Sequence, residues 1–72
     1  MFDNLFNAGH SYYLFSTGTN FKGKTFSSRA EAESFMKAYC AKNNINIELT
    51  EDDKHEKKYS DHKGVRFYIN RV

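Results

Sequence analysis

Residues 28–44 read SRAEAESFMKAYCAKNN. Ser28 followed by Glu31 is the capping-box pattern, in which each side chain accepts a hydrogen bond from the other residue's backbone N–H. Apolar residues then recur at spacings of three and four, as in an amphipathic helix, at Ala32, Phe35, Met36, Tyr39 and Cys40. Asn43 and Asn44 tolerate the left-handed conformation that commonly ends a helix. This stretch therefore predicts one amphipathic helix over residues 29–42.

The residues before this helix predict two strands. Residues 10–16 contain the contiguous run Tyr-Tyr-Leu-Phe, which indicates a strand with packing on both faces. Residues 17–20 are typical of a turn, and residues 21–26 of a short returning strand that Gly23 interrupts. A hairpin is therefore expected to precede the helix.

The residues after the helix begin with a regular alternation. Apolar and polar side chains alternate over residues 45–50, which is the pattern of a half-buried strand. Its apolar side chains, expected to face the core, are Ile45, Ile47 and Leu49.

A turn signal near the C-terminus predicts the remaining strands. Asp61 and Gly64 occupy the first and fourth positions of a type I turn. Residues 55–60 are therefore expected to form a polar strand at the edge of the sheet, paired with a strand over residues 65–70. The inward side chains of that last strand are Val65, Phe67 and Ile69.

Together these elements predict an α+β fold, with residues 1–72 forming a single small two-layer domain. One principal helix packs on an antiparallel-rich sheet of four or five strands, in the order β-β-α-β-β-β. A chain of 72 residues buries little surface, but seven Phe and five Tyr residues compensate with large rings. Phe35→Ala and Phe67→Ala are each expected to cost about 3–5 kcal/mol.

Composition excludes several classes of protein. A lone cysteine cannot form an intramolecular disulfide, and no run approaches the roughly 20 apolar residues of a membrane-spanning helix. The first residues lack the charged and apolar regions of a secretory signal, so a cytoplasmic location is expected. Lys, Asn, Phe, Tyr and Ile, which have AT-rich codons, are abundant, and this usage favours a phage or mobile-element gene.

The residues that bear chemistry do not form a catalytic or metal-binding pattern. Structural zinc sites use four ligands in closely spaced pairs, whereas Cys40, His55 and His62 are widely separated. The chain also has no Gly-x-Ser-x-Gly sequence and no phosphate-binding loop. We therefore expect no enzymatic activity, no metal, no cofactor, no membrane contact and no small-molecule substrate.

One hypothesis is a small nucleic-acid-binding module that uses a basic and aromatic face of the sheet. Its candidate residues are Lys22, Lys24, Lys63, Arg66, Arg71 and Tyr13. Cations of the two hairpins would bind phosphates, and an aromatic ring would stack on bases. The formal net charge is only +2, which is small for a dedicated nucleic-acid-binding protein.

The favoured hypothesis is a small non-enzymatic binding protein, an accessory or regulatory factor that modulates a host macromolecule by direct protein contact. Phe2, Leu5 and Phe6 are spaced to line one face of a helical turn, and Tyr68 is expected on the sheet face away from the helix. Those N-terminal residues either bind a partner or fold back over that face. The partner is a protein or a second copy of this chain.

Overall fold

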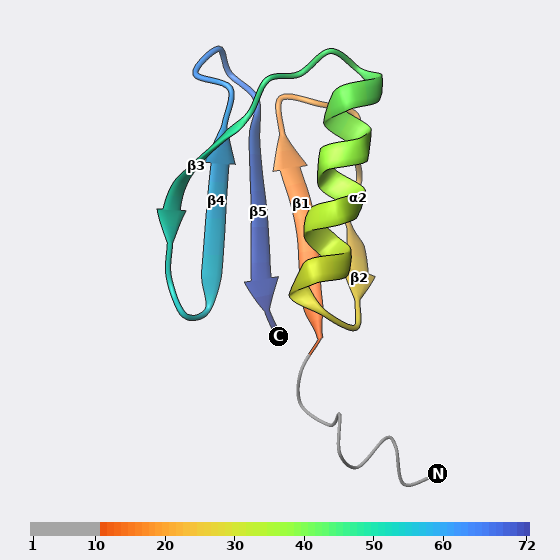
Figure 1. The fold of residues 1–72 in the computed structure, drawn as a ribbon, viewed down its shortest axis with the longest axis vertical. Coiled ribbons are helices and arrows are strands. Elements are labelled where there is room, and N and C mark those ends of the chain that lie inside the picture. Colours follow the sequence, from red (N-terminus) through yellow and green to blue (C-terminus); the bar gives the residue numbers. More distant parts are fainter. Residues whose placement is uncertain (1–10) are drawn as a thin grey trace, which may run out of the picture.

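The computed structural model describes residues 11–72, in which one helix lies against one face of a five-stranded sheet (Figure 1). Across the sheet the strands follow the order β2-β1-β5-β4-β3, and every neighbouring pair is antiparallel. The predicted α+β fold and its β-β-α-β-β-β order are therefore confirmed. The elements are β1 (Tyr12–Thr17), β2 (Lys24–Phe26), α2 (Arg29–Lys42), β3 (Glu48–Asp52), β4 (Glu56–Ser60) and β5 (Arg66–Arg71).

Helix α2 has the predicted bounds, and its first turn is capped by side chains. The backbone N–H of Glu31 donates to the Ser28 hydroxyl at 3.1 Å. The Glu31 carboxylate accepts from the backbone N–H and the hydroxyl of Ser27, at 3.3 and 2.8 Å. The N-cap is therefore as predicted, but the return contact of the capping box reaches Ser27 instead of Ser28.

The core lies between α2 and the central strands of the sheet. Its buried side chains are Leu14, Ala32, Met36, Cys40, Tyr59, Phe67 and Ile69. Phe35 and Tyr39, predicted on the same helical stripe, are only half-buried at its margin. There the Phe21 ring lies 5.6 Å from the Phe35 ring and 5.5 Å from the Tyr39 ring.

The strand that follows the helix differs from the prediction. It begins at Glu48 instead of residue 45, and all five of its residues are exposed. Leu49, expected in the core, has 49% of its surface exposed. The reason is its position: β3 is an edge strand, whereas α2 packs on β1, β2 and β5. The predicted edge strand, β4, instead lies inside the sheet between β3 and β5.

The turn between β4 and β5 lies where it was predicted, but its backbone is not type I. His62 has φ of 61°, whereas the second residue of a type I turn has a negative φ. The Asp61 carboxylate accepts hydrogen bonds from the backbone N–H groups of Lys63 and Val65, at 2.7 and 2.9 Å. These bonds hold the loop closed and lower the pKa of Asp61.

Candidate functional site

Three aromatic rings lie side by side on the sheet face opposite α2. Tyr13 and Phe15 alternate along β1 with the buried Leu14, and Tyr68 lies directly opposite Phe15 on β5. The Phe15 and Tyr68 rings stack with centroids 4.7 Å apart, and the Tyr13 and Phe15 rings with centroids 5.8 Å apart. All three residues are half-buried. We call this set, Tyr13, Phe15 and Tyr68, the aromatic ladder.

The loop before β2 borders the ladder. Gly23 lies so close to the Tyr13 hydroxyl that a Cβ at this position would overlap the tyrosine ring. Its φ of +103° also favours glycine. This conformation explains why the predicted strand over residues 21–26 shortens to Lys24–Phe26. Lys22, which directly precedes Gly23, is exposed.

On the side of the ladder formed by β4 and β3, the side chains are mainly carboxylates. The Lys58 ammonium, on the strand next to Tyr68, lies 3.1 Å from the Glu51 carboxylate and 3.7 Å from that of Glu56. The hydrogen bond that the Lys58 ammonium donates to the Glu51 carboxylate is the main cause of the raised pKa of Lys58. Glu48 pairs in register with Ser60, and its carboxylate lies 3.2 Å from Nε2 of His62. We call Glu48, Glu51 and Glu56 the acidic margin.

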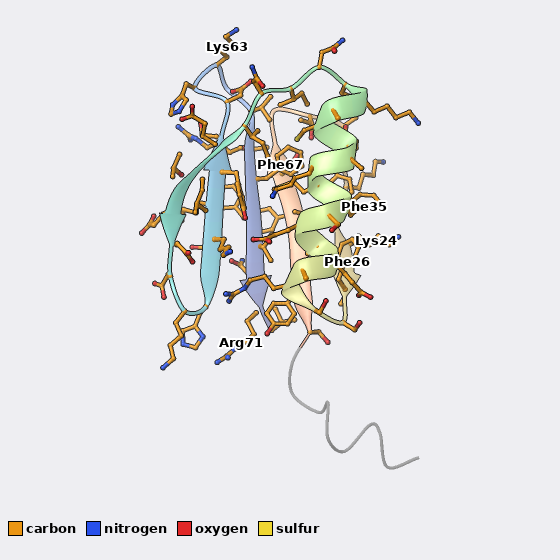
Figure 2. All side chains as sticks on the ribbon, viewed as in Figure 1. Lys24, Phe26, Phe35, Lys63, Phe67 and Arg71 are labelled. Carbon is orange, nitrogen blue, oxygen red and sulfur yellow. The ribbon has the colours of Figure 1, made fainter. Side chains whose placement is uncertain are left out.

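The structure separates the residues predicted to bind nucleic acid. The Lys24 ammonium lies over the Phe26 and Phe35 rings, at 5.4 and 5.0 Å from their centroids, on the side of the sheet that α2 covers. Lys63 and Arg71 lie at opposite ends of the molecule (Figure 2). Of the six candidates, Tyr13 and Arg66 share the ladder face, because Thr17 of β1 pairs with Arg66.

Of the four residues predicted to bind a protein partner, the structure describes only Tyr68. Tyr68 belongs to the aromatic ladder. Phe2, Leu5 and Phe6 lie outside the described residues. Their predicted contact with a partner or with the sheet stays a prediction. Sequence patterning had placed Tyr68 on this face correctly, since alternation with Phe67 and Ile69 is a local property of β5.

A second polar cluster lies on the α2 side of the sheet. The Lys57 ammonium and the Glu33 carboxylate are 2.6 Å apart, and the Tyr59 hydroxyl donates to Glu33 at 2.8 Å. The Lys57 hydrogen bond lowers the pKa of Glu33, whereas burial raises the pKa of Tyr59 well above its ordinary value. Sequence reasoning missed this cluster because its members come from α2 and β4, 24 and 26 residues apart.

A groove of about 600 Å³ lies beside this cluster, between α2 and the outer strands. Its wall includes Met36, Cys40, Ile45 and Leu49. Burial raises the pKa of the Cys40 thiol, so this cysteine packs as a small apolar side chain and not as a nucleophilic thiolate. The Glu33 carboxylate in the groove is already engaged by Lys57 and Tyr59.

The described part of the chain holds no group of three or more His, Cys, Asp or Glu side chains placed to bind a metal ion. Within residues 11–72, the single helix is too short and too polar to cross a membrane. No protein-family model matches the chain, and no curated protein or solved structure matches it. The aromatic ladder with its acidic margin is therefore the strongest candidate site in residues 11–72.

Proposed function

We propose that this protein is a small accessory or regulatory factor that acts by binding a protein chain at its aromatic ladder, without catalysing a reaction. The observation that carries the proposal is the stack of Tyr13, Phe15 and Tyr68 on the sheet face opposite the only helix of residues 11–72. Aromatic side chains are the residues most enriched among the energetic anchors of protein interfaces.

The electrostatics of the ladder face favour a protein over a nucleic acid. The acidic margin brings three carboxylates to this face, and the Lys58 cation beside them is engaged by two of those carboxylates. A nucleic-acid backbone needs several free cations, because phosphate contacts supply most of its affinity. Carboxylates near an apolar centre are instead ordinary rim residues of a protein interface.

The edges of the sheet argue that a partner binds the face. Strand addition needs a free, regular edge, and both edges here are poor templates. Strand β2 has three residues and follows Gly23. Strand β3 is fully exposed, rich in acidic side chains and irregular between Leu49 and Glu51.

A phage or mobile-element origin and a cytoplasmic location belong to the same proposal. Amino-acid usage supports the first, and the single reduced cysteine supports the second. Modulation of a host macromolecule is the activity that such a small factor would perform by occupying a partner's surface.

Binding of a nucleic acid is the second candidate, because Tyr13 and Arg66 share the ladder face and stacked rings can accept bases. Fluorescence anisotropy with labelled single-stranded and double-stranded DNA and RNA, at about 50 and 200 mM salt, separates the two functions. We expect flat traces at both salt concentrations. Tight binding that salt weakens steeply, and that Arg66→Ala reduces, would replace the proposed function with this one.

Site-specific photo-crosslinking tests protein binding directly. A photoreactive phenylalanine analogue replaces Phe15 in the ladder, and in a control protein it replaces Leu49, which is exposed on the opposite face. After irradiation in cells that express the protein, we expect peptide adducts of a protein chain at position 15 and none at position 49. Equal yields at the two positions would contradict a partner at the ladder.

A further inference from the structure

We infer that residues 2–6 of the same chain cover the aromatic ladder in the free protein, and that a partner must displace them in order to bind. The inference rests on the proposed function, since it states what regulates access to the same face. Phe2, Leu5 and Phe6 lie outside the described residues. Their site is therefore inferred from the place where residues 11–72 begin, and from the surfaces within reach of that place.

The described chain begins directly before the strand that carries two of the ladder rings. Ser11 exchanges backbone hydrogen bonds with Val72, at 3.4 and 2.8 Å, and β1 starts at the next residue. The stretch from Ser11 back to Phe6 spans at most about 17 Å. Phe15 lies four residues beyond Ser11 along β1, a distance of about 13 Å. A reversal of the chain over residues 7–9, whose sequence Asn-Ala-Gly is typical of a turn, therefore brings Phe6 over the ladder.

The apolar groove on the other face is a poorer site for this segment. Arg29, at the start of α2, donates to the Lys54 carbonyl at 2.9 Å and so links the helix to the loop after β3. The start of α2 and this loop lie at the end of the molecule where the chain enters β1 (Figure 1). The link therefore stands between Ser11 and the groove, whereas Tyr13 of the ladder follows Ser11 by two residues.

The ladder rings suit aromatic side chains as a covering layer. The Phe15 ring is nearly parallel to the rings of Tyr68 and Tyr13, with interplanar angles of 13° and 26°. This stacking occupies the facing sides of the rings and leaves their edges for a further contact, and all three residues stay partly exposed. The edge of one aromatic ring prefers the face of another. Phe2 and Phe6 can supply two such faces.

The spacing of the segment also matches the spacing of the ladder. Phe2 and Phe6 are four residues apart, which is about 6 Å along a helical turn. The ring centroids of the ladder are 5.8 and 4.7 Å apart. One helical turn therefore sets the two phenylalanine rings over neighbouring rings of the ladder, with Leu5 on the same face of the turn.

The tether favours this segment over any other apolar occupant. A segment joined to its site by a few residues meets that site at an effective concentration of about 1 mM. With a Kd of about 0.1 mM for the untethered segment, the ladder is covered in roughly nine molecules of ten. A partner then binds about tenfold more weakly than it would bind the uncovered face. The covering segment therefore excludes weakly binding proteins from the ladder.

Nuclear Overhauser effects (NOEs) in the full chain are the primary test. We expect NOEs from the side chains of Phe2 and Phe6 to the rings of Phe15 and Tyr68. NOEs from the segment to Leu49 instead would place it in the groove and overturn the inference, as would a segment with no NOE to any described residue. In an equimolar mixture of isotope-labelled and unlabelled chains, ladder NOEs between two chains would assign the contact to a second copy and equally overturn it.

Chemical modification of Tyr68 measures how much of the ladder is covered. Phe6→Ser removes one apolar side chain and so weakens binding of the segment about tenfold, which leaves the ladder uncovered in about half of the molecules. Nitration of Tyr68 by tetranitromethane should therefore become about fivefold faster. Asn4→Ser is the matched control, because it places the same serine on the opposite side of the helical turn.

The control variant should nitrate at the wild-type rate, and Tyr39, which is half-buried on α2, serves as the internal reference in each protein. Circular dichroism verifies that both variants are folded. If Tyr68 is nitrated at the same rate in Phe6→Ser and Asn4→Ser, the segment does not cover the ladder.

The outcomes separate this inference from the proposed function. The crosslinker at position 15 joins either the segment, which leaves the mass of the chain almost unchanged, or a partner, which increases the mass. When both statements are right, Phe6→Ser gives more partner adduct than Asn4→Ser. Ladder NOEs without a partner adduct in any of these proteins would uphold the covered ladder and refute the proposed function. Partner adducts of equal yield in the two variants would uphold the proposed function and refute the inference.

Discussion

Phe67 is fully enclosed between α2 and the sheet, where its ring lies 6.2 Å from that of Phe21 and 5.9 Å from that of Tyr39. Phe35 is half-buried at the margin of the same cluster. We expect Phe67→Ala to lower the free energy of unfolding by about 3–5 kcal/mol, and Phe35→Ala by roughly half as much, since less buried area is lost. Equilibrium urea denaturation measures both changes, and equal losses would contradict this order of burial.

The lowered pKa of Glu33 predicts that the free energy of unfolding depends on pH. The Lys57 contact lowers the pKa of Glu33 in the folded chain. The stabilisation is therefore complete above the ordinary Glu pKa of 4.5 and is lost as the pH falls through the lowered folded value. We expect Glu33→Gln to be less stable than the wild type at pH 7 and to lose less stability on acidification.

Urea denaturation between pH 7 and pH 3 provides the measurement for Glu33. Glu48→Gln is the matched control, because it changes a carboxylate whose side chain is 74% exposed and outside the Glu33 cluster. The wild type and Glu48→Gln should lose similar stability on acidification. If the Glu33→Gln curve instead runs parallel to that of the wild type, the Lys57 contact does not stabilise the folded state.

At the scale of the element, the stability of α2 depends on the capping of its first turn. Ser28 satisfies the backbone N–H of Glu31, a group that has no partner within the helix itself. We expect Ser28→Ala to lower the free energy of unfolding by about 1 kcal/mol. Ser27→Ala is the control, since Ser27 contacts only the exposed Glu31 carboxylate. Thermal unfolding followed by circular dichroism should show the larger decrease in Tm for Ser28→Ala, and the reverse order would identify Ser27 as the cap.

The strands show which local signals are reliable. Alternation in residues 65–70 correctly predicted that Phe67 and Ile69 face the core. The same pattern predicted that Ile45, Ile47 and Leu49 face the core, and this was right only in part: Ile45 and Ile47 pack half-buried against the core, whereas Leu49 is exposed. Alternation reports that one face of a strand is apolar, but burial also requires a layer to cover that face. Helix α2 covers β5 and does not extend to β3.

At the scale of the whole molecule, the acidic edge strand is expected to protect against aggregation. An exposed edge presents unpaired backbone groups, and charged side chains discourage its pairing with other chains. We expect the double variant Asp52→Val, Asp53→Val to scatter more light than the wild type at 37 °C. Both residues are exposed at the end of β3 or just after it.

A matched control separates this edge effect from added hydrophobicity. Lys37→Val with Lys42→Val adds the same two side chains at exposed positions of α2, which has no free strand edge. This control also brings the formal net charge from +2 to zero, a change that by itself promotes association. More scattering from the β3 variant than from this control would therefore isolate the edge effect, and a β3 variant that scatters no more than the wild type would show that the acidic edge is not protective.

The sequence by itself determined the features that depend on neighbours within a few residues. The helix over residues 29–42, the Ser28 cap, the position of the turn at Asp61 and the inward face of β5 were all predicted from such patterns. Caps, apolar periodicity and turn residues act over one or two turns of chain, so their effect is present in the local sequence.

Only the tertiary structure decided which strands are neighbours. This strand order in turn decided which side chains meet in the candidate site. Placing β5 between β1 and β4 joined Phe15 to Tyr68 and set Lys58 beside them. It also placed Lys24 and Arg66 on opposite faces and left Leu49 beyond the cover of α2. Strand pairing joins segments that are distant in the chain, and the choice among possible pairings depends on packing of the whole core, which no local pattern encodes.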